Sequence, residues 1–445
     1  MEHFYIQDIT LSNYRKFEQS TFQLNPSMNV LVGKNAAGKT TILEAVNVML
    51  GAYLAAYKKY VPSRFVCNIS ENDILLKINK KNAKSILLAT AIPQYPCVVS
   101  SHMVWDKEQF GYTRMVEKEG GRTKFSGKNP MQQYVKKWEE AIEKADGSDE
   151  KYIFPLVLYL SSARLWNENR GKEYESIPVR TDAYQRSLDP HRSSQMAFEY
   201  LKSLRNISVE ENDGKPFPTY EAIMDAVRYS LKEELEEKQS VIYSSRYREI
   251  AIKNADGTVI RFASLSDGYR NVIKIVTDIA TKMCILNPYL GADALKMTPG
   301  IVVIDEIDLS LHPTWQKRII RILKTLFPKV QFICATHSPF IIQSLEPGEL
   351  ITLDDIVEEE YSGQSIEDIA EDIMNVSTPQ YSEKKQEMYR AAAEYFDALE
   401  NSKSPEEIQI LKERADLLAA EYSDNPAYCA LLQQQYLERK ADLEG

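Results

Sequence analysis

The sequence predicts an α/β fold with a doubly wound parallel sheet, an antiparallel subdomain and a helical extension at its carboxyl end. Three observations support this fold class. The apolar stretch "MNVLV" runs into a glycine-bounded loop and then into a helix pattern. Strand and helix patterns alternate between residues 247 and 353, which is typical of a parallel sheet with helical crossovers. After residue 356 the pattern is helical, without strand signals.

The first segment, residues 1–62, predicts strand, turn and strand before "MNVLV". The helix after the glycine-bounded loop carries Ile42, Leu43, Val46 and Leu50 at helical spacing, so we expect these side chains on its buried face. Together these elements form the amino-terminal lobe of the predicted core.

The middle segment, residues 63–240, mixes strand patterns such as "SILLATAI" and "FPLVLYL" with helix patterns such as "QYVKKWEEAIEKA" and "TYEAIMDAVRYSLKEELEEKQ". No heptad repeat runs long enough for a coiled-coil arm. We therefore expect a compact α/β insertion.

The third segment, residues 241–355, begins with a hairpin that turns at Asp256 and Gly257. A helix follows, and then the strands "GIVVIDE", "VQFICAT" and "LITLD" with helices between them. The tail, residues 356–445, predicts acidic helices, one of which starts at "SPEE" with Ser404 as N-cap and Pro405 at the first helical position.

Composition places the chain among ordinary globular proteins of ~2–3 domains, with 445 residues, 44% hydrophobic and 27% charged. Its five cysteines have no paired or metal-like spacing, which favours a reduced compartment. The amino terminus lacks a signal-peptide pattern, and no apolar stretch approaches the ~20 residues that span a bilayer. We expect a cytoplasmic protein without a membrane partner.

The net charge of −10 is concentrated in the tail. Residues 356–445 carry 8 Lys and Arg against 21 Asp and Glu, a net of −13, which leaves residues 1–355 at +3. "KINKKNAK" (77–84) and "GGRTKFSGK" (120–128) are basic stretches that could contact DNA or RNA, or could be solvated loops. The acidic tail would be repelled by nucleic acid, so it favours a protein partner.

The stretch "GKNAAGKT" matches the phosphate-loop pattern between a strand and a helix. Its backbone N–H groups can surround a phosphate, Lys39 can reach the β- and γ-phosphates, and the Thr40 hydroxyl can ligate Mg²⁺. The predicted ATP-binding residues are therefore Gly33, Lys34, Asn35, Ala36, Ala37, Gly38, Lys39, Thr40 and Thr41.

Two further strand ends carry polar residues. In "GIVVIDEID", Asp305 is predicted to hold Mg²⁺ together with Thr40, and Glu306 to polarise the attacking water. In "ICATHSP", His337 is predicted to bond the γ-phosphate and that water. The sequence thus predicts a Mg²⁺-dependent ATPase with Glu306 and His337 as catalytic residues.

Taken together, "GKNAAGKT", "LSDGYR", "VVIDEID" and "ATHSP" resemble the motifs of ABC-type P-loop ATPase heads, and "LSNYRKF" resembles the RecF/SMC/OLD-like branch. The resemblance implies that the chain forms a head-to-head dimer or higher homo-oligomer. Its signature residues Ser266, Asp267 and Gly268 would then bind the ATP of a partner chain. Asp267 replaces the usual glycine, so we expect it to point away from phosphate or to cap its helix.

Two more family elements concern loops. "LSLH" (309–312) would be the D-loop, which crosses to the opposite subunit. The family's strand-end glutamine, a ligand in the Mg²⁺ shell, has no convincing counterpart, and Gln94 is only a weak candidate.

"FPLVLYLSSARLW", "DLSLHPTWQ" and the tail resemble a narrower group, the ATPase subunits of antiphage systems such as Septu and certain retrons. This implies an ATP-switched sensor that controls a separate nuclease, with an HNH-type nuclease favoured and the tail as its docking site. The alternative is a RecF-like DNA-binding ATPase of repair or recombination. A nuclease activity of its own would require a Toprim domain, for which the tail has no room, so none is expected.

Overall fold

The computed structural model describes most of the chain, and every structural statement below refers to these residues. The described ranges are 3–78, 91–144, 152–165, 178–190, 195–353, 361, 363–400 and 404–422. The contacts divide the chain into two units, Met1–Gln364 and Ser365–Gly445.

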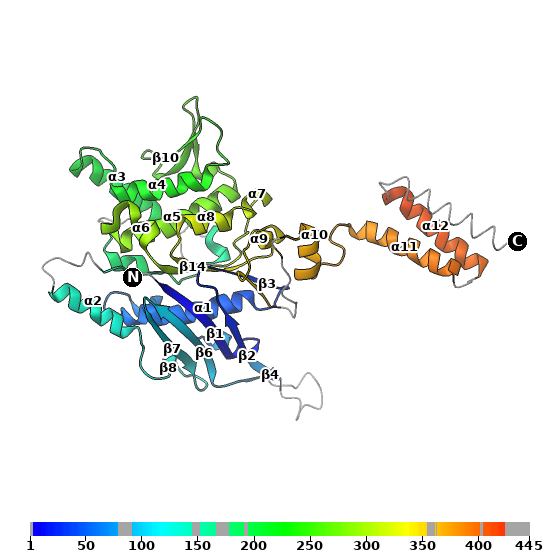
Figure 1. Cartoon of the computed structure of the whole chain (residues 1–445), viewed down its shortest axis with the longest axis horizontal. Coiled ribbons are helices and arrows are strands. Elements are labelled where there is room, and N and C mark those ends of the chain that lie inside the picture. Colours follow the sequence, from blue (N-terminus) through cyan, green and yellow to red (C-terminus); the bar gives the residue numbers. More distant parts are fainter. Residues whose placement is uncertain are drawn as a thin grey trace. The chain divides into compact units, whose positions relative to one another are not determined.

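A parallel sheet forms the core of the first unit (Figure 1). Its described strands lie in the order β15, β3, β14, β13 and β9, and all of its pairings are parallel. The strands are β3 (Met28–Val32), β9 (Leu156–Leu160), β13 (Gly300–Ile304), β14 (Val330–Ala335) and β15 (Leu350–Thr352). Every residue of β3, β9, β13 and β14 is buried, as expected for strands covered on both faces. The predicted fold class is confirmed.

An antiparallel sheet lies on one side of this core, in the order β2, β1, β6, β7 and β8. Its strands are β1 (Phe4–Tyr14), β2 (Phe17–Gln23), β6 (Cys97–Trp105), β7 (Glu108–Val116) and β8 (Lys124–Phe125). Helix α1 (Lys39–Ala56) contacts strands of both sheets and so lies between them (Figure 1). All four residues predicted for its buried face are buried.

Gln331, at the start of β14, joins the two sheets through its side chain. Its Nε2 donates to the Ile6 carbonyl oxygen at 2.7 Å, and its Oε1 accepts from the Ile6 backbone N at 2.8 Å. The side chain is almost fully buried and also donates to the carbonyl oxygen of Asn25 at 2.9 Å. A buried amide is stable only when its donors and acceptors are paired, and here they fix β1 against β14.

Helices and two smaller sheets complete the first unit. Helix α5 contacts β9, α3 and α4, and helix α4 contacts β10 and α8. The remaining strands are β4 (Leu76–Ile78) paired with β5 (Ala91–Pro93), and β10 (Ser240–Ser244), β11 (Glu249–Lys253) and β12 (Val259–Arg261) in a sheet of their own. The remaining helices are α2 (Gln132–Lys144), α3 (Gln195–Glu211), α4 (Pro218–Leu231), α5 (Asp267–Leu286), α6 (Ala294–Met297), α7 (Pro313–Gln316), α8 (Ile319–Leu326) and α9 (Pro339–Gln343).

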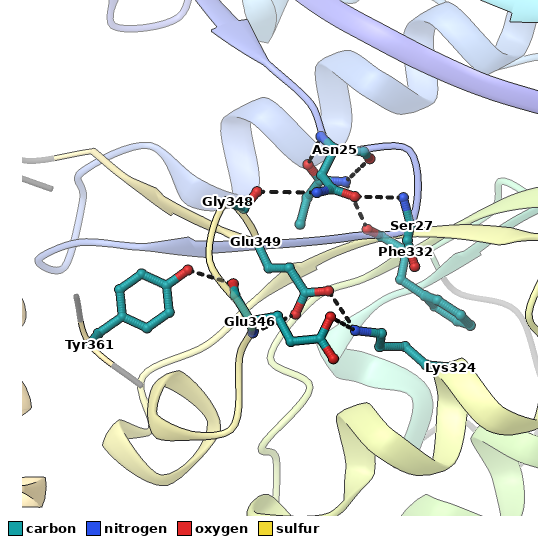
Figure 2. A network of polar contacts seen from close by, with 9 residues as sticks. Asn25, Ser27, Lys324, Phe332, Glu346, Gly348, Glu349 and Tyr361 are labelled. Carbon is teal, nitrogen blue, oxygen red and sulfur yellow. Dashed lines mark hydrogen bonds and ion pairs between the residues drawn. The ribbon is translucent and has the colours of Figure 1, made fainter. Parts of the chain in front are cut away.

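A partly buried ion pair fixes the last strand of the parallel sheet (Figure 2). Lys324 Nζ on α8 lies 2.7 Å from Glu349 Oε1 and 2.8 Å from Glu346 Oε2. Glu349 precedes β15 directly, and its side chain is only 4% exposed. Tyr361 donates its hydroxyl to the Glu346 carbonyl oxygen at 2.7 Å, so the chain beyond β15 is tied to the same turn.

The second unit contains α10 (Ile366–Asp368), which continues into one turn of π-helix, and the helices α11 (Glu383–Glu400) and α12 (Pro405–Tyr422). Helices α11 and α12 pack on each other through small clusters that include Met388, Tyr395 and Ala419. Ser404 caps α12 as predicted, because its Oγ accepts from the Glu407 backbone N at 3.3 Å.

Some sequence expectations differ from the structure in detail. The helix predicted for 219–239 ends at Leu231, since turns follow it. The strand "SILLATAI" lies mostly outside the described residues, as do Trp166 and the carboxyl end of the tail. The predicted insertion, residues 63–240, contributes β6 to β8 to the antiparallel sheet and β9 to the parallel sheet. The segment boundaries at 62, 240 and 355 stay predictions.

Candidate nucleotide site

The phosphate loop connects the carboxyl end of β3 to the start of α1. Lys39 Nζ donates to the carbonyl oxygens of Gly33 at 2.6 Å and Lys34 at 3.2 Å, so the ammonium lies within the curve of the loop. The loop is also closed by a turn in which the Ala37 backbone N donates to the Lys34 carbonyl oxygen at 3.0 Å. Lys39 is 7% exposed, so its charge is directed inward at the place where a phosphate would be surrounded.

Gly38 is the loop position at which glycine is required. It precedes α1 with φ of 107°, in the left-handed region that favours glycine, and a Cβ there would lie 2.7 Å from the Phe17 ring. Lys16 Nζ donates to the Ala36 carbonyl oxygen at 3.0 Å, so the turn between β1 and β2 holds the loop from outside. A larger residue at position 38 would therefore clash with the Phe17 ring and displace the loop that is shaped to surround a phosphate group.

Thr40 and Asp305, the two predicted Mg²⁺ ligands, lie next to each other. The Thr40 hydroxyl oxygen is 3.4 Å from each carboxylate oxygen of Asp305. Asp305 follows β13 directly, and its backbone N donates to the Leu160 carbonyl oxygen at 2.9 Å, which extends the ladder with β9. A hydroxyl and a carboxylate are hard oxygen ligands of the kind that Mg²⁺ prefers, so this pair fits the ion.

Glu306 lies where the chain leaves the sheet. It has φ of 47°, a left-handed conformation that is uncommon for a residue with a side chain, and it is exposed. The Leu309 backbone N donates to the Glu306 carbonyl oxygen at 2.9 Å and closes the turn. The side chain of Glu306 is not among the residues that line the phosphate-loop hollow.

His337 follows β14 by two positions and is brought to the phosphate loop. It lines an open hollow of about 370 Å³ together with residues of the loop and of the β1–β2 turn. The lining comprises Arg15, Lys16, Asn35, Ala36, Gly38, Lys39, Thr40, Thr41 and His337. The structure thus brings six of the nine predicted loop residues and His337 to one surface, although the sequence separates them by about 300 positions, whereas Gly33, Lys34 and Ala37 do not line the hollow.

The cations Arg15 and Lys16 were not among the predicted site residues, and the structure adds them to this hollow. Arg15 Nη2 is 2.8 Å from Asp73 Oδ1 and also forms an ion pair with Glu44 of α1. The signal that could have identified them is the stretch "NYRKF" itself, in which two cations directly follow a strand that leads toward a phosphate loop.

The Arg15 ion pairs affect the charges close to Asp305. Burial raises the pKa of Glu44, whereas Arg15 lowers it, and the net shift is upward. Burial lowers the pKa of Arg15, but the nearby Glu44, Tyr14 and Asp73 outweigh it and raise the value. Arg15 therefore stays a cation at the edge of the hollow and offsets the acidic residues beneath the loop.

The predicted signature residues lie at the start of α5, and no described residue of 264–268 lines the hollow. Ser266 precedes the first helical residue but accepts no capping hydrogen bond with its side chain. Asp267 forms an ion pair with Arg270 one turn later, so it does not cap the helix. A Cβ on Gly268 would lie 3.1 Å from the Ser310 carbonyl oxygen, so glycine here also allows close packing on the turn after Glu306.

Neither Gln94 nor the residue that follows β9 provides the strand-end glutamine of the family. Gln94 follows β5, which pairs with β4 in a two-stranded sheet and is not part of the described parallel sheet. Its side-chain amide donates to the Ile92 carbonyl oxygen. The strand of the middle segment that does border Asp305 is β9, and it is followed by Ser161, whose hydroxyl donates to the Pro190 carbonyl oxygen. Gln94 therefore has no support as a ligand.

A parallel sheet with a phosphate loop after one strand, and an acid pair and a histidine after two neighbouring strands, defines a P-loop ATPase of the ABC-like class. A family model described as "AAA domain" matches residues 8–242, and a second AAA-domain model matches residues 155–343. The first match covers more than half of the chain, so the chain belongs to this AAA-domain family.

Relatives carry the names of the two systems that the motifs resemble. The chain is 24% identical to "Retron Ec83 probable ATPase" of Escherichia coli, over 77% of this chain and 70% of that protein. It is 44% identical to "Septu protein PtuA" of Bacillus mycoides (strain KBAB4) over 93 residues, 21% of this chain and 12% of that protein. The resemblance to Septu and retron ATPases is therefore confirmed.

Among solved structures, the "SMC head domain from Thermotoga maritima" aligns over 78% of this chain and 94% of that chain, with 14% identity and a TM-score of 0.41. In the part of the chain that the structure describes, no helix is long and apolar enough to cross a membrane. The same residues contain no group of three or more His, Cys, Asp or Glu side chains arranged to hold a metal ion.

Proposed function

We propose that this chain binds and hydrolyses ATP with Mg²⁺ at the phosphate-loop hollow. The observation that carries the proposal is the convergence of Lys39, Thr40 and His337 on one hollow, with Asp305 beside Thr40. Residues 33–41 would hold the phosphates, and Thr40 and Asp305 would hold Mg²⁺. The metal ion, when bound, supplies charge neutralisation at the β- and γ-phosphates.

The proposed hydrolysis needs a base and a group that orients the attacking water. Glu306 is the proposed base, because a carboxylate directly after the Mg²⁺ ligand can accept the proton of a water at the γ-phosphate. His337 is the proposed partner of that water, since it lines the same hollow as Lys39. Both roles are supported by the positions of the two residues, because Glu306 follows the carboxyl end of β13 and His337 follows the carboxyl end of the neighbouring strand β14.

We further propose that two chains close head to head, with Ser266, Asp267 and Gly268 of each chain completing the ATP site of the other. The support is that these residues lie at the amino end of the long helix α5 and outside the hollow of their own chain. The amino end of a helix attracts anions. Arg270 pairs with Asp267 and so offsets the carboxylate that would otherwise repel a phosphate.

The relatives named as a retron ATPase and as Septu protein PtuA support a proposal for the biological role. We propose that the chain is the sensor and regulatory subunit of an antiphage system and controls a separate nuclease, HNH-type favoured, without nuclease activity of its own. The segments 1–62, 63–240 and 241–355 would form the ATPase head, and the acidic segment 356–445 would dock the nuclease. The second unit supports this assignment, because α11 and α12 pack on each other and form a small apolar core of their own.

The experiment that tests the ATPase proposal is ATP binding and phosphate release with the purified full chain and with Lys39→Ala. We expect Mg²⁺-dependent hydrolysis by the unaltered protein and loss of nucleotide binding in the variant, because Lys39 is the buried cation of the loop. Lys59→Ala removes an exposed lysine that pairs with Glu139 and serves as the matched control. A RecF-like repair role would instead require ATP-dependent binding of duplex DNA.

A further inference from the structure

Asp308 connects the two chain segments that carry the proposed catalytic residues. Its Oδ1 accepts a hydrogen bond from Thr336 Oγ1 at 2.6 Å and one from the His337 backbone N at 3.4 Å. Asp308 follows Glu306 by two positions, and Thr336 directly precedes His337. One carboxylate oxygen therefore fixes the start of the histidine loop to the turn that leaves Glu306.

The residues on both sides of His337 are held, whereas the imidazole itself is exposed to the hollow. Thr336 is fully buried, so its hydroxyl requires a partner, and Asp308 provides it. Ser338 donates its backbone N to Thr336 Oγ1 at 3.0 Å and its hydroxyl to Gln316 Oε1 at 2.5 Å. These bonds fix the backbone on which the imidazole direction depends.

The turn that contains Asp308 is itself held from the opposite side by α5. Asn271, which is fully buried, donates its Nδ2 to the Leu309 carbonyl oxygen at 2.7 Å. Glu306 and Ser310 flank this contact with φ of 47° and 57°. Backbone in this region is costly for residues with a Cβ, and it persists where surrounding contacts determine it. Asp308 is thus part of a rigid turn and can act as a fixed reference for His337.

We propose that Asp308 is a positioning residue for ATP hydrolysis, which acts by holding His337 against the phosphate loop through Thr336. The inference rests on the proposed ATPase function. In metal sites, the residues that orient the ligands contribute about 10- to 100-fold in activity, and we expect an effect of this size from Asp308. Because Asp308 touches neither the hollow nor the loop, it contributes to the rate of hydrolysis and not to the affinity for ATP.

The test is a double-mutant cycle with Asp308→Ala, His337→Ala and the double variant, measured at saturating ATP and Mg²⁺. We expect Asp308→Ala to lower kcat about 10- to 100-fold, with ATP affinity unchanged, and to have no further effect when His337 is already alanine. Asp308→Asn keeps an oxygen that can accept both hydrogen bonds, so it should restore most of the rate.

A second pair of variants keeps the test available if Asp308→Ala does not fold. Thr336→Val has nearly the same shape but lacks the donated hydroxyl, whereas Thr336→Ser keeps it, so only the valine variant should lose rate. Effects of Asp308→Ala, or of Thr336→Val, that multiply with that of His337→Ala would refute the proposal and leave the ATPase function intact. An unaltered chain that binds ATP but never hydrolyses it would refute both.

Discussion

The Thr40 hydroxyl lies 3.4 Å from both carboxylate oxygens of Asp305, although 265 positions separate the two residues in the sequence. Thr40 is in the first turn of α1, and Asp305 is the first residue after β13. Neither position can move far, because α1 is packed between two sheets and β13 lies inside one of them. The two proposed Mg²⁺ ligands are therefore held in fixed positions relative to each other.

The first prediction concerns this pair. Asp305→Asn removes the negative charge while keeping the shape, so it should raise the Mg²⁺ concentration for half-maximal ATP hydrolysis by about 10- to 100-fold. Thr40→Ser retains the hydroxyl and should stay close to the unaltered protein. The measurement is a Mg²⁺ titration of phosphate release at fixed ATP. An unchanged Mg²⁺ requirement in Asp305→Asn would show that the carboxylate is not a ligand.

The second prediction concerns Glu306. Glu306→Gln keeps the size and hydrogen bonding of the side chain but removes the base, so turnover should fall ~10²–10⁴-fold while ATP still binds. Binding of a fluorescent ATP analogue and phosphate release, measured on the same preparation, separate the two effects. Because Glu306 has a left-handed backbone, Glu306→Gly is an informative partner variant that relaxes the backbone and also lacks the base. Normal turnover in either variant would assign the base elsewhere.

Most of the fold could be predicted because its signals are local. "MNVLV", "GIVVI" and "VQFICA" are continuous apolar runs, and each became a fully buried strand of the parallel sheet. Pairing is less local. The sequence does not indicate that β6 to β8 extend the sheet begun by β1, because alternating burial in an antiparallel strand does not identify the neighbouring strand.

In the candidate site, too, local signals could be predicted from the sequence, whereas contacts between distant residues could not. Residues of the phosphate loop and the acid pair are recognisable because several chemical requirements coincide within a few positions. Arg15 and Asp308 were missed because each acts on residues that are distant in the chain: Arg15 on Asp73, and Asp308 on Thr336. Ion pairs and buried hydrogen bonds of this kind leave no periodic signal, so these contacts are found only in the structure, although "NYRKF" does mark Arg15 by its position after a strand.

The third prediction concerns the Lys324–Glu349 pair that anchors β15 (Figure 2). Lys324→Met would leave the buried Glu349 carboxylate without its cation; because the Lys324 side chain is itself partly exposed to solvent, this should cost roughly 1–3 kcal/mol of unfolding free energy. Glu349→Gln keeps the hydrogen bonds without the charge and should cost less. Urea unfolding at neutral pH measures both, and equal stability of Lys324→Met and the unaltered protein would contradict the anchoring role.

The same pair gives a pH dependence whose sign is fixed. Burial lowers the pKa of Lys324, but the hydrogen bonds to Glu346 and Glu349 outweigh it, and the net shift is upward. A lysine whose pKa is raised in the folded state contributes its full stabilisation at pH values below its ordinary pKa of ~10.4. This stabilisation is lost as the pH rises through the pKa of the folded state. The difference in unfolding free energy between the unaltered protein and Lys324→Met should therefore shrink above that pH.

The fourth prediction concerns the boundary between the two units. A chain that ends at Gln364 retains every strand of the parallel sheet and the Tyr361 contact to Glu346, so it should fold and bind ATP. A chain that ends at Leu345 lacks β15 and Glu349, so it should be markedly less stable. Thermal unfolding and ATP binding compare the two. If the longer truncation fails as badly as the shorter one, the second unit is required for the head to fold.

The last prediction tests whether the signature residues act on a partner chain. Ser266 and Gly268 lie outside the hollow that contains Lys39 of the same chain. Ser266→Arg, which fills the proposed contact with a long cation, should abolish hydrolysis while leaving ATP binding nearly unchanged. Lys39→Ala should abolish binding itself, so each variant alone should be inactive for a different reason.

A mixture of the two variants decides between action in the same chain and action in the partner. In a mixed dimer, the Ser266→Arg chain contributes an intact phosphate loop, and the Lys39→Ala chain contributes an intact signature, so one of the two shared sites is complete. Such a dimer should regain about half of the unaltered activity. Subunit exchange is verified with two fluorescent labels, and mixing either variant with itself is the control. If mixed dimers form and stay inactive, the signature does not complete a partner's site, and the proposal of shared ATP sites fails, whereas the role of the phosphate loop would stand on the Lys39→Ala result.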